Sequence, residues 1–185
     1  MDSKAFMGLF IAFLMLGGMF GIFMSGSQGT SKFRYNDFIF KYDESGILYT
    51  EFNDEQVFFR YSPSSVNGSD IPQDFVDIVK NTNKIYYTRD LNENSFVEVE
   101  SLGYDLAQNL FNTHELYVHV GVTDNTSAYF VDCSMATLVN PVIYVKQSNE
   151  SKVTYDNYCL TAEVRDNYDV YILRDELLYR ILGVI

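Results

Sequence analysis

The sequence predicts an α/β or α+β fold, in which one mixed-sheet domain follows a hydrophobic N-terminal helix. Three observations support this prediction. Residues 5–24 form an unbroken apolar run, which is typical of a membrane-spanning helix. Residues 37–61 contain short aromatic-rich runs joined by polar turns, the pattern of antiparallel strands. Residues 84–122 carry a strand pattern, a helix pattern and a second strand pattern, which is the order of a βαβ unit.

The N-terminal run defines the domain organisation. It is 20 residues long and contains neither a charged residue nor a proline. A helix rises about 1.5 Å per residue, so the run spans about 30 Å, the thickness of the hydrocarbon core of a bilayer. We therefore expect an anchor helix over residues 1–24. Residues 25–32 are rich in Gly and Ser and are expected to form a flexible tether, and residues 33–185 one folded domain.

Two other interpretations of the run stay open. A cleaved secretory signal has an apolar region of only about 7–15 residues, and Ser25-Gly26-Ser27 is a weak cleavage site. A pilin-like leader is the second alternative, because Lys4-Ala5 before Phe6 resembles the basic-plus-small junction that archaeal prepilin peptidases cut. The Gly/Ser tether argues against a typical pilin, in which the apolar helix continues into the head domain. The retained anchor is favoured.

The chain is expected at the cell membrane as a single-pass protein, with its N-terminus in the cytoplasm and its domain outside. Positive charge does not decide the orientation, because Lys4 precedes the run whereas Lys32 and Arg34 follow it. The long domain with only two cysteines favours the outside. The membrane is thus the first expected partner, through residues 5–24.

Composition bounds the function of the domain. Apolar residues make up 47% of the chain and aromatic residues 16%, which is enough for one core of normal size. The net charge of -12 argues against nucleic acid as a partner, because nucleic-acid binding needs a basic face. It also argues against adhesion of the domain to an anionic membrane surface.

The first half of the domain is expected to begin with an antiparallel meander. Its three strands are predicted at residues 37–42, 47–52 and 56–61, with turns at Asp43–Gly46 and Asn53–Glu55. A helix follows up to Lys80, with Pro72 in its first turn and an apolar stripe of Phe75, Val76, Ile78 and Val79.

The middle of the chain predicts the βαβ unit. Its strands are expected at residues 84–88 and 116–122, and Ser95 is expected to cap the helix between them with Glu98 as its capping-box partner. Such a crossover makes the two strands parallel and the connection right-handed.

The last segment predicts a hairpin and a closing helix. A strand at residues 141–145 is expected to pair with a strand at 152–155, and a further strand begins at Cys159. The helix is expected at 168–182, with Gly183 as its stop and residues 184–185 packed on the body. Its apolar stripe is expected to face the core and its charges the solvent. The charged residues are Arg174, Asp175, Glu176 and Arg180.

The two cysteines, Cys133 and Cys159, are expected to form a disulfide, because a lone pair outside the cytoplasm usually does so. It closes a loop of about 25 residues and contributes roughly 3–3.5 kcal/mol on the chain-entropy model. Two buried free thiols are the alternative. Short-spaced ligands for a metal are absent from the sequence.

Other candidate sites are weak. Asn67, Asn125 and Asn149 lie in N-x-[ST] sequons and are possible glycosylation sites. His114 and His119 are one residue too far apart for the zinc-binding H-E-x-x-H motif. No catalytic, cofactor-binding or metal-ligating residue is assigned, and no cofactor is expected.

One resemblance is carried by Cys133, the strand Pro141–Tyr144, Cys159 and the final helix Arg174–Gly183. Over about the last 55 residues the chain resembles uncharacterised single-pass, membrane-anchored proteins of small-genome archaea, which also have an N-terminal apolar helix and end in a D-x-L-x-Y-x-x-L-G helix. The resemblance implies the same topology and no function.

The sequence therefore leaves three hypotheses. The favoured one is a membrane-anchored extracytoplasmic binding or assembly protein that is not an enzyme and has a protein partner. The second is a pilin-like filament subunit cleaved before Phe6. The third is a hydrolase with an unfamiliar site, which requires two or more of four carboxylates at the carboxyl ends of strands. These are Asp37, Asp90, Asp124 and Asp132.

Overall fold

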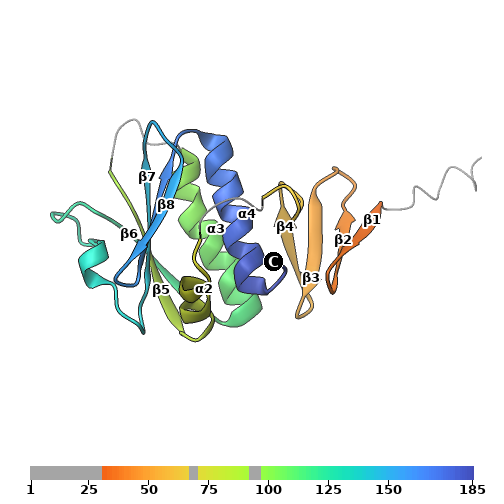
Figure 1. Cartoon of the computed structure of the whole chain (residues 1–185), viewed down its shortest axis with the longest axis horizontal. Coiled ribbons are helices and arrows are strands. Elements are labelled where there is room, and N and C mark those ends of the chain that lie inside the picture. The colour runs from red at the N-terminus through yellow and green to blue at the C-terminus, as the bar shows by residue number, and fades with distance from the viewer. Residues whose placement is uncertain (1–30, 67–70, 92–96) are drawn as a thin grey trace, which may run out of the picture. The chain divides into compact units, whose positions relative to one another are not determined.

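The structure is a computed structural model that describes residues 31–66, 71–91 and 97–185. The predicted anchor, nearly all of the predicted tether, the sequon at Asn67 and the predicted cap Ser95 lie outside the described residues. Within the described part, none of the helices is both long enough and apolar enough to span a membrane. Residues 32–185 form one compact unit, and its described part contains two sheets and three α-helices (Figure 1).

The first sheet is an antiparallel meander in the order β1-β2-β3-β4. Its strands are β1 (Lys32–Tyr35), β2 (Phe38–Tyr42), β3 (Leu48–Phe52) and β4 (Glu55–Phe59). The three predicted strands are confirmed, and β1 was missed because it has four residues and begins inside the predicted tether. Asn53 and Asp54 both have positive φ, at 50° and 67°, as a tight two-residue turn between β3 and β4 requires.

The second sheet has the order β6-β5-β7-β9-β8, and all neighbours are parallel except β8 and β9. Its strands are β5 (Lys84–Arg89), β6 (Tyr117–Val122), β7 (Val142–Gln147), β8 (Lys152–Asp156) and β9 (Cys159–Val164). The βαβ unit is confirmed, because β5 and β6 are parallel and α3 (Val97–His114) connects them. The predicted partner of β8 was wrong: β8 forms its hairpin with β9, and β7 lies inside the sheet.

The wrong partner has a physical cause. The strand β7 is an almost continuous apolar run, which suits a central parallel strand covered on both faces. The strand β8 alternates exposed and half-buried residues, as an edge strand does. Asn157 and Tyr158 supply the two positive-φ positions that turn β8 directly into β9.

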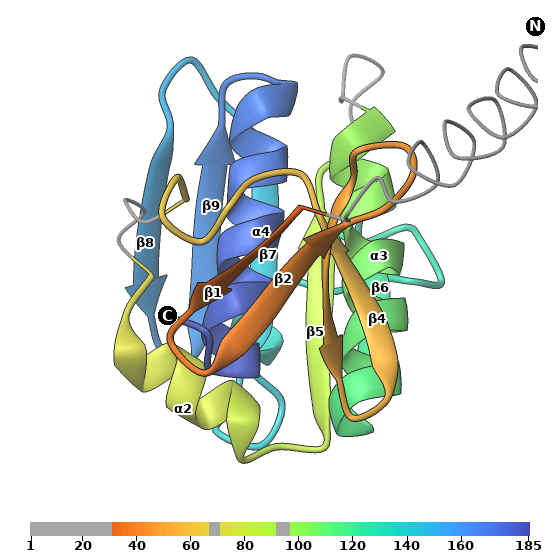
Figure 2. The same ribbon diagram turned by 90° about the vertical axis from the view of Figure 1, so that its right-hand side faces the viewer.

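Helices α2 (Gln73–Lys80), α3 and α4 (Asn167–Leu182) lie between the two sheets, so this unit has three layers (Figure 1). Figure 2 shows the meander passing in front of α4. Asp166 caps α4 by accepting the Asp169 N–H at 3.0 Å, and Gly183 ends the helix with φ at 77°, as predicted. Val184 is buried, and its carbonyl accepts the Asn36 side-chain N–H at 2.8 Å.

The predicted orientation of the charges on α4 was wrong. Asp175 and Glu176 are completely buried, and the Arg174 and Arg180 side chains are only 11% and 17% exposed. If α4 packed against one sheet only, its charged face would lie in water. Because α4 lies between two sheets, the meander covers that face. An aromatic cluster fills this interface, in which the Tyr179 ring stacks on Phe59 with centroids 4.1 Å apart.

The disulfide lies on the other face of the second sheet. Cys133 belongs to the short 3-10 helix η1 (Cys133–Met135) and Cys159 begins β9; the two residues are at disulfide distance, with Cα atoms 5.4 Å apart. The bond joins the long connection between β6 and β7 to the sheet surface, where Val131 and Val142 are buried beside it.

Candidate functional site

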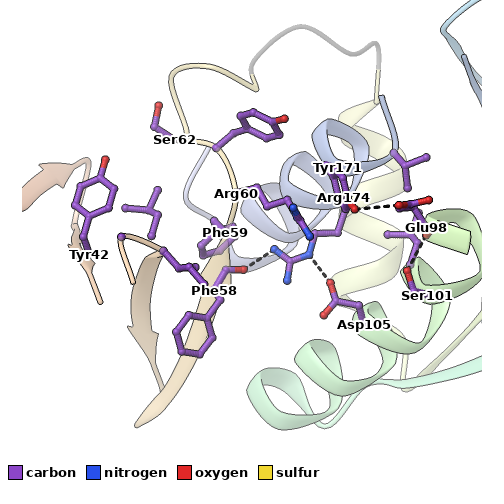
Figure 3. Close-up of a pocket in the computed structure, with 16 residues that line it drawn as sticks. Tyr42, Phe58, Phe59, Arg60, Ser62, Glu98, Ser101, Asp105, Tyr171 and Arg174 are labelled. Atoms are coloured by element: carbon purple, nitrogen blue, oxygen red, sulfur yellow. Dashed lines mark hydrogen bonds and ion pairs between the residues drawn. The ribbon is translucent and has the colours of Figure 1, made fainter. Parts of the chain in front are cut away.

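An open groove of about 770 Å³ lies where the meander meets α3 and α4 (Figure 3). The strands β3 and β4 form one wall, the segment after β4 forms its end, and α3 and α4 form the other wall. The groove is lined by apolar and charged side chains, among them Ile47, Phe58, Arg60, Glu98, Asp105, Tyr171 and Arg174.

Helical spacing explains why these side chains meet. On α3, Glu98, Ser101 and Asp105 lie three or four positions apart and therefore on one face of the helix. On α4, Tyr171 and Arg174 are three positions apart and face the same groove.

Arg174 forms the floor of the groove. Its guanidinium donates to the Asp105 carboxylate, to the Phe58 carbonyl and to Asp175 Oδ1, the last at 2.7 Å. Burial alone lowers the pKa of Arg174, but the two carboxylates outweigh it and the pKa is raised. Arg174 is thus a largely buried cation whose Nε and Nη1 groups are engaged by the protein itself.

Asp175 connects the floor to the meander. Its Oδ2 atom accepts the backbone N–H groups of Arg60 and Tyr61, both at 2.8 Å. Burial raises the pKa of Asp175, and the Arg174 guanidinium and the two N–H groups oppose that rise. Together Arg174 and Asp175 pair with the outer edge of β4 and its continuation, as a neighbouring strand would.

Arg60 has a different environment at the mouth of the groove. Its side chain is exposed, and its guanidinium carbon lies 3.7 Å from the centroid of the Tyr171 ring. The Tyr171 hydroxyl donates to Glu98 at 3.4 Å, which orients the ring. Among the described residues, none forms a hydrogen bond or ion pair with the Arg60 guanidinium.

The opposite wall is apolar. Ile47 and Phe58 are large side chains that remain 47% and 40% exposed, and Tyr42 and Leu48 lie beside them in the groove. A smaller depression of about 490 Å³ continues the groove along β4 and shares Phe58, Asp105 and Arg174 with it. The arrangement places an available cation within the same groove as exposed apolar surface.

The four carboxylates of the hydrolase hypothesis lie on separate elements. Asp90 follows β5, where its Oδ1 accepts the hydroxyls of Thr123 and Tyr144, both at 2.7 Å. Burial and then this hydrogen bond raise the pKa of Tyr144. Asp124 follows the adjacent strand β6 and bonds Thr126 within its own loop, which lowers the pKa of Asp124.

The other two carboxylates do not join them. Asp132 caps η1 through Ser134, and Asp37 lies in the β1–β2 turn beside Arg34. Of the described His, Cys, Asp and Glu residues, no three are grouped in a way that could hold a metal ion. Asp90 and Asp124 thus follow the carboxyl ends of the adjacent parallel strands β5 and β6, as the hydrolase hypothesis requires, and that hypothesis stays a prediction.

The remaining sequence candidates are placed as follows. His114 ends α3 and stacks on Phe52 with centroids 4.9 Å apart, whereas His119 lies in β6 beside Tyr86. The two histidines are thus not on one helix, as the zinc motif requires. Asn125 and Asn149 are exposed in loops, and their glycosylation stays a prediction.

The sequence interpretation missed Arg60, Tyr171, Arg174 and Asp175 as a connected group. One signal was present: the charges of the final helix come as a balanced set, with Glu176 and Arg180 four positions apart and paired at 2.8 Å. A balanced set is what a charged helix needs in order to be buried.

Comparison of the chain with protein-family models, with curated proteins and with solved structures found no match. The function therefore has to be argued from the geometry of the site.

The first prediction concerns the contact between Asp175 and the edge of β4. Asp175→Ala leaves two backbone N–H groups and part of the Arg174 charge without a buried partner. We expect the free energy of unfolding to fall by about 3 kcal/mol, measured by urea denaturation of the full chain in detergent. Glu44→Gln, an exposed position in the β2–β3 turn, serves as control and should change it by less than about 0.5 kcal/mol. An unchanged midpoint for Asp175→Ala would contradict this account of the contact.

The second prediction concerns pH. Burial and then the nearby Lys80 charge lower the pKa of His114, so the unfolded chain binds a proton at this position more readily than the folded chain. Its contribution to stability is therefore complete above the ordinary histidine pKa of about 6.5 and is lost as the pH falls through the lowered folded value.

His114→Phe keeps the ring on Phe52 and removes the proton, so its stability should fall less between pH 7.5 and pH 5.5 than that of the parent chain. The two chains should differ in the pH dependence of their free energy of unfolding by well below about 1.4 kcal/mol per pH unit, because His114 is half-exposed and water screens its charge. Urea unfolding at the two pH values measures it. Equal slopes for the parent and His114→Phe would refute the role of His114.

Proposed function

We propose that the chain is a membrane-anchored extracytoplasmic binding or assembly protein, and that its groove binds a partner segment in which a carboxylate stands beside an apolar side chain. One observation carries the proposal: the Arg60 guanidinium carbon lies 3.7 Å from the centroid of the Tyr171 ring, without a described polar partner, in a groove that also exposes Ile47 and Phe58.

The chemistry of Arg60 favours an anion. A guanidinium stacked on an aromatic ring is held by its face, and its N–H edge stays available for a bidentate contact with a carboxylate. Arg174 is less suited to this role, because its side chain is only 11% exposed and its Nε and Nη1 groups already bond Asp105, Asp175 and the Phe58 carbonyl. The apolar wall adds affinity by removing the ligand's apolar surface from water.

Topology is the second part of the proposal. Residues 5–24 are proposed to anchor the chain in the membrane, with the N-terminus in the cytoplasm and the domain outside. The disulfide-distance pair Cys133 and Cys159 supports an oxidising compartment, and the net charge of -12 supports a partner other than nucleic acid. A protein partner in or near the same membrane is consistent with both.

The third prediction tests the groove with a minimal ligand. N-acetyl-phenylalanine should shift the NMR signals of groove residues in the labelled full chain, with a dissociation constant of about 1 mM, as expected for a ligand of this size. Its uncharged amide should bind about tenfold more weakly, because a charge-assisted hydrogen bond is lost. Arg60→Gln should abolish the difference between acid and amide.

The matched control is Arg165→Gln, which removes an exposed arginine outside the groove that pairs with Asp169. It should bind like the parent chain. Equal affinity for acid and amide in the parent chain would reject the carboxylate, and shifts outside the groove would reject the site.

The pilin-like subunit remains the alternative function, on the evidence of the Lys4-Ala5-Phe6 junction. The fourth prediction separates the two: N-terminal sequencing of protein purified from native membranes should begin at Met1 or Asp2, because the anchor is retained. A chain that begins at Phe6 would instead support the filament, and one that begins after residue 24 would support a cleaved signal.

A further inference from the structure

The amino half of strand β4 has open backbone groups along its outer edge. A two-residue turn joins β3 to β4, so the odd-numbered residues from 55 to 59 exchange backbone hydrogen bonds with β3. The backbone groups of Gln56 and Phe58 therefore point away from the sheet. Contacts with α4 confirm this direction, because the Phe58 carbonyl and the Arg60 N–H both bond side chains of that helix. No described residue bonds the Gln56 N–H, the Gln56 carbonyl or the Phe58 N–H.

These open groups belong to the depression of about 490 Å³ that continues the groove along β4. The depression lies between the β4 edge and α3, and it shares Phe58, Asp105 and Arg174 with the groove. Sites that hold small ligands usually measure about 300–1,000 Å³, and both cavities fall in this range. A ligand can therefore extend from the groove into the depression without leaving the surface of the protein.

The α3 wall of the depression carries peptide-like chemistry. Gln108 and Asn112 lie four positions apart and thus on one face of the helix, and both side chains are exposed. A side-chain amide offers N–H donors and a carbonyl acceptor, as a backbone does. The part of the chain that the structure describes provides no hydrogen-bond partner for either amide. A main chain lying between β4 and α3 would meet donors and acceptors on both sides.

Charge differs between the two ends of this combined cavity. Arg60 lies at the groove end, where the lining carboxylates are already bonded by Tyr171 and Arg174. Asp54 and Glu55 are exposed at the far end of the depression, about 17 Å away along β4 for a rise of about 3.3 Å per residue. A ligand carboxylate is attracted at the first end and repelled at the second, which sets the direction of the ligand.

We propose that the groove and the depression together bind the free C-terminus of a partner protein, as an extended strand parallel to β4. The inference rests on the proposed function and deepens it, because it names the part of the partner, its conformation and its direction. The terminal carboxylate lies at Arg60 and the last, apolar side chain lies at Ile47 and Phe58. The preceding residues run along β4 toward Glu55.

The hydrogen bonds of such a strand follow from the open groups. In a parallel pair, one residue of the segment donates its N–H to the Gln56 carbonyl and accepts the Phe58 N–H at its own carbonyl. The residue two positions earlier accepts the Gln56 N–H, so the pairing adds three hydrogen bonds. Past this point Arg174 and Asp175 occupy the edge of β4. A chain that ends there leaves fewer polar groups unpaired than a chain that continues, which favours a terminus.

Peptide length gives the fifth prediction. In the labelled full chain, N-acetyl-Thr-Val-Thr-Val-Phe with a free carboxylate should bind at least about tenfold more tightly than N-acetyl-phenylalanine, because the pairing with β4 is added. The pentapeptide should also shift the NMR signals of Gln56 and Gln108, which N-acetyl-phenylalanine should leave in place. Equal affinity of the two ligands would overturn the proposal.

A matched pair of variants tests the backbone contact. Gln56→Pro removes an outward N–H and spares the pairs between β3 and β4, so the pentapeptide should bind it within about threefold of N-acetyl-phenylalanine. Gln56→Ala keeps the N–H and should keep the tighter binding. N-acetyl-phenylalanine should bind both variants as it binds the parent chain, which checks that they are folded. A Pro variant that retains the full gain would overturn the pairing.

Modified peptides decide the matter if the Pro variant does not fold. N-methylation of the third residue of the pentapeptide removes the N–H that faces the Gln56 carbonyl and should abolish the gain, whereas N-methylation of the fourth residue, which faces away from β4, should retain it. A nitroxide at the N-terminus of the peptide should broaden the signals of Asp54 and Asn112. Broadening at Glu98 and Tyr171 instead, or equal effects of the two N-methyl groups, would overturn the proposal.

The free terminus is tested against a side-chain carboxylate. N-acetyl-Thr-Val-Thr-Phe-Asp-amide should bind at least about fivefold more weakly than the pentapeptide acid, and equal binding would reject the terminus as the ligand. Failure of this inference differs from failure of the proposed function. If N-acetyl-phenylalanine and its amide bind equally, the carboxylate site itself is rejected. If they differ but the pentapeptide gains nothing, only the strand along β4 is rejected.

Discussion

The architecture depends on the contact between α4 and the outer edge of β4. Arg174 donates to the Phe58 carbonyl, and Asp175 accepts the N–H groups of Arg60 and Tyr61. Two adjacent helical side chains thus offer the donor and the acceptor that a fifth strand of the meander would offer. The contact holds the meander on the helical layer, and because it fixes the backbone of Arg60, it also determines where the groove opens.

Buried charge at this position has an energetic logic. Taking charged groups out of water is expensive, and an apolar contact of the same size often stabilises a protein as well or better. An apolar side chain, however, does not hydrogen-bond the edge of β4, whose N–H and carbonyl groups need partners once α4 covers them. The pair is therefore best understood as hydrogen-bonding groups for a buried edge, with Asp105 as the second carboxylate that balances Arg174.

Elements with a local signal were predictable from the sequence. The turns between β2, β3 and β4, the βαβ unit, α2 and the Gly183 stop each follow from residues close in the chain. The partner of β8 and the burial of Asp175 do not, because they depend on segments far apart: Arg60 and Asp175 are separated by 115 residues. Periodicity identifies the face of a helix that packs against one layer, and it has no means of showing that a second sheet covers the opposite face. The groove residues were missed for the same reason, since its walls come from three distant segments.

The two sheets satisfy their outer strands by different means. The meander closes the carboxyl half of its β4 edge with side chains from α4, so that half has become an internal surface beside a groove. The second sheet closes the carboxyl half of β6 with residues 129–131, which the connection to η1 supplies. That connection is joined to β9 by Cys133 and Cys159, which helps to hold residues 129–131 beside Val122 at the carboxyl end of β6.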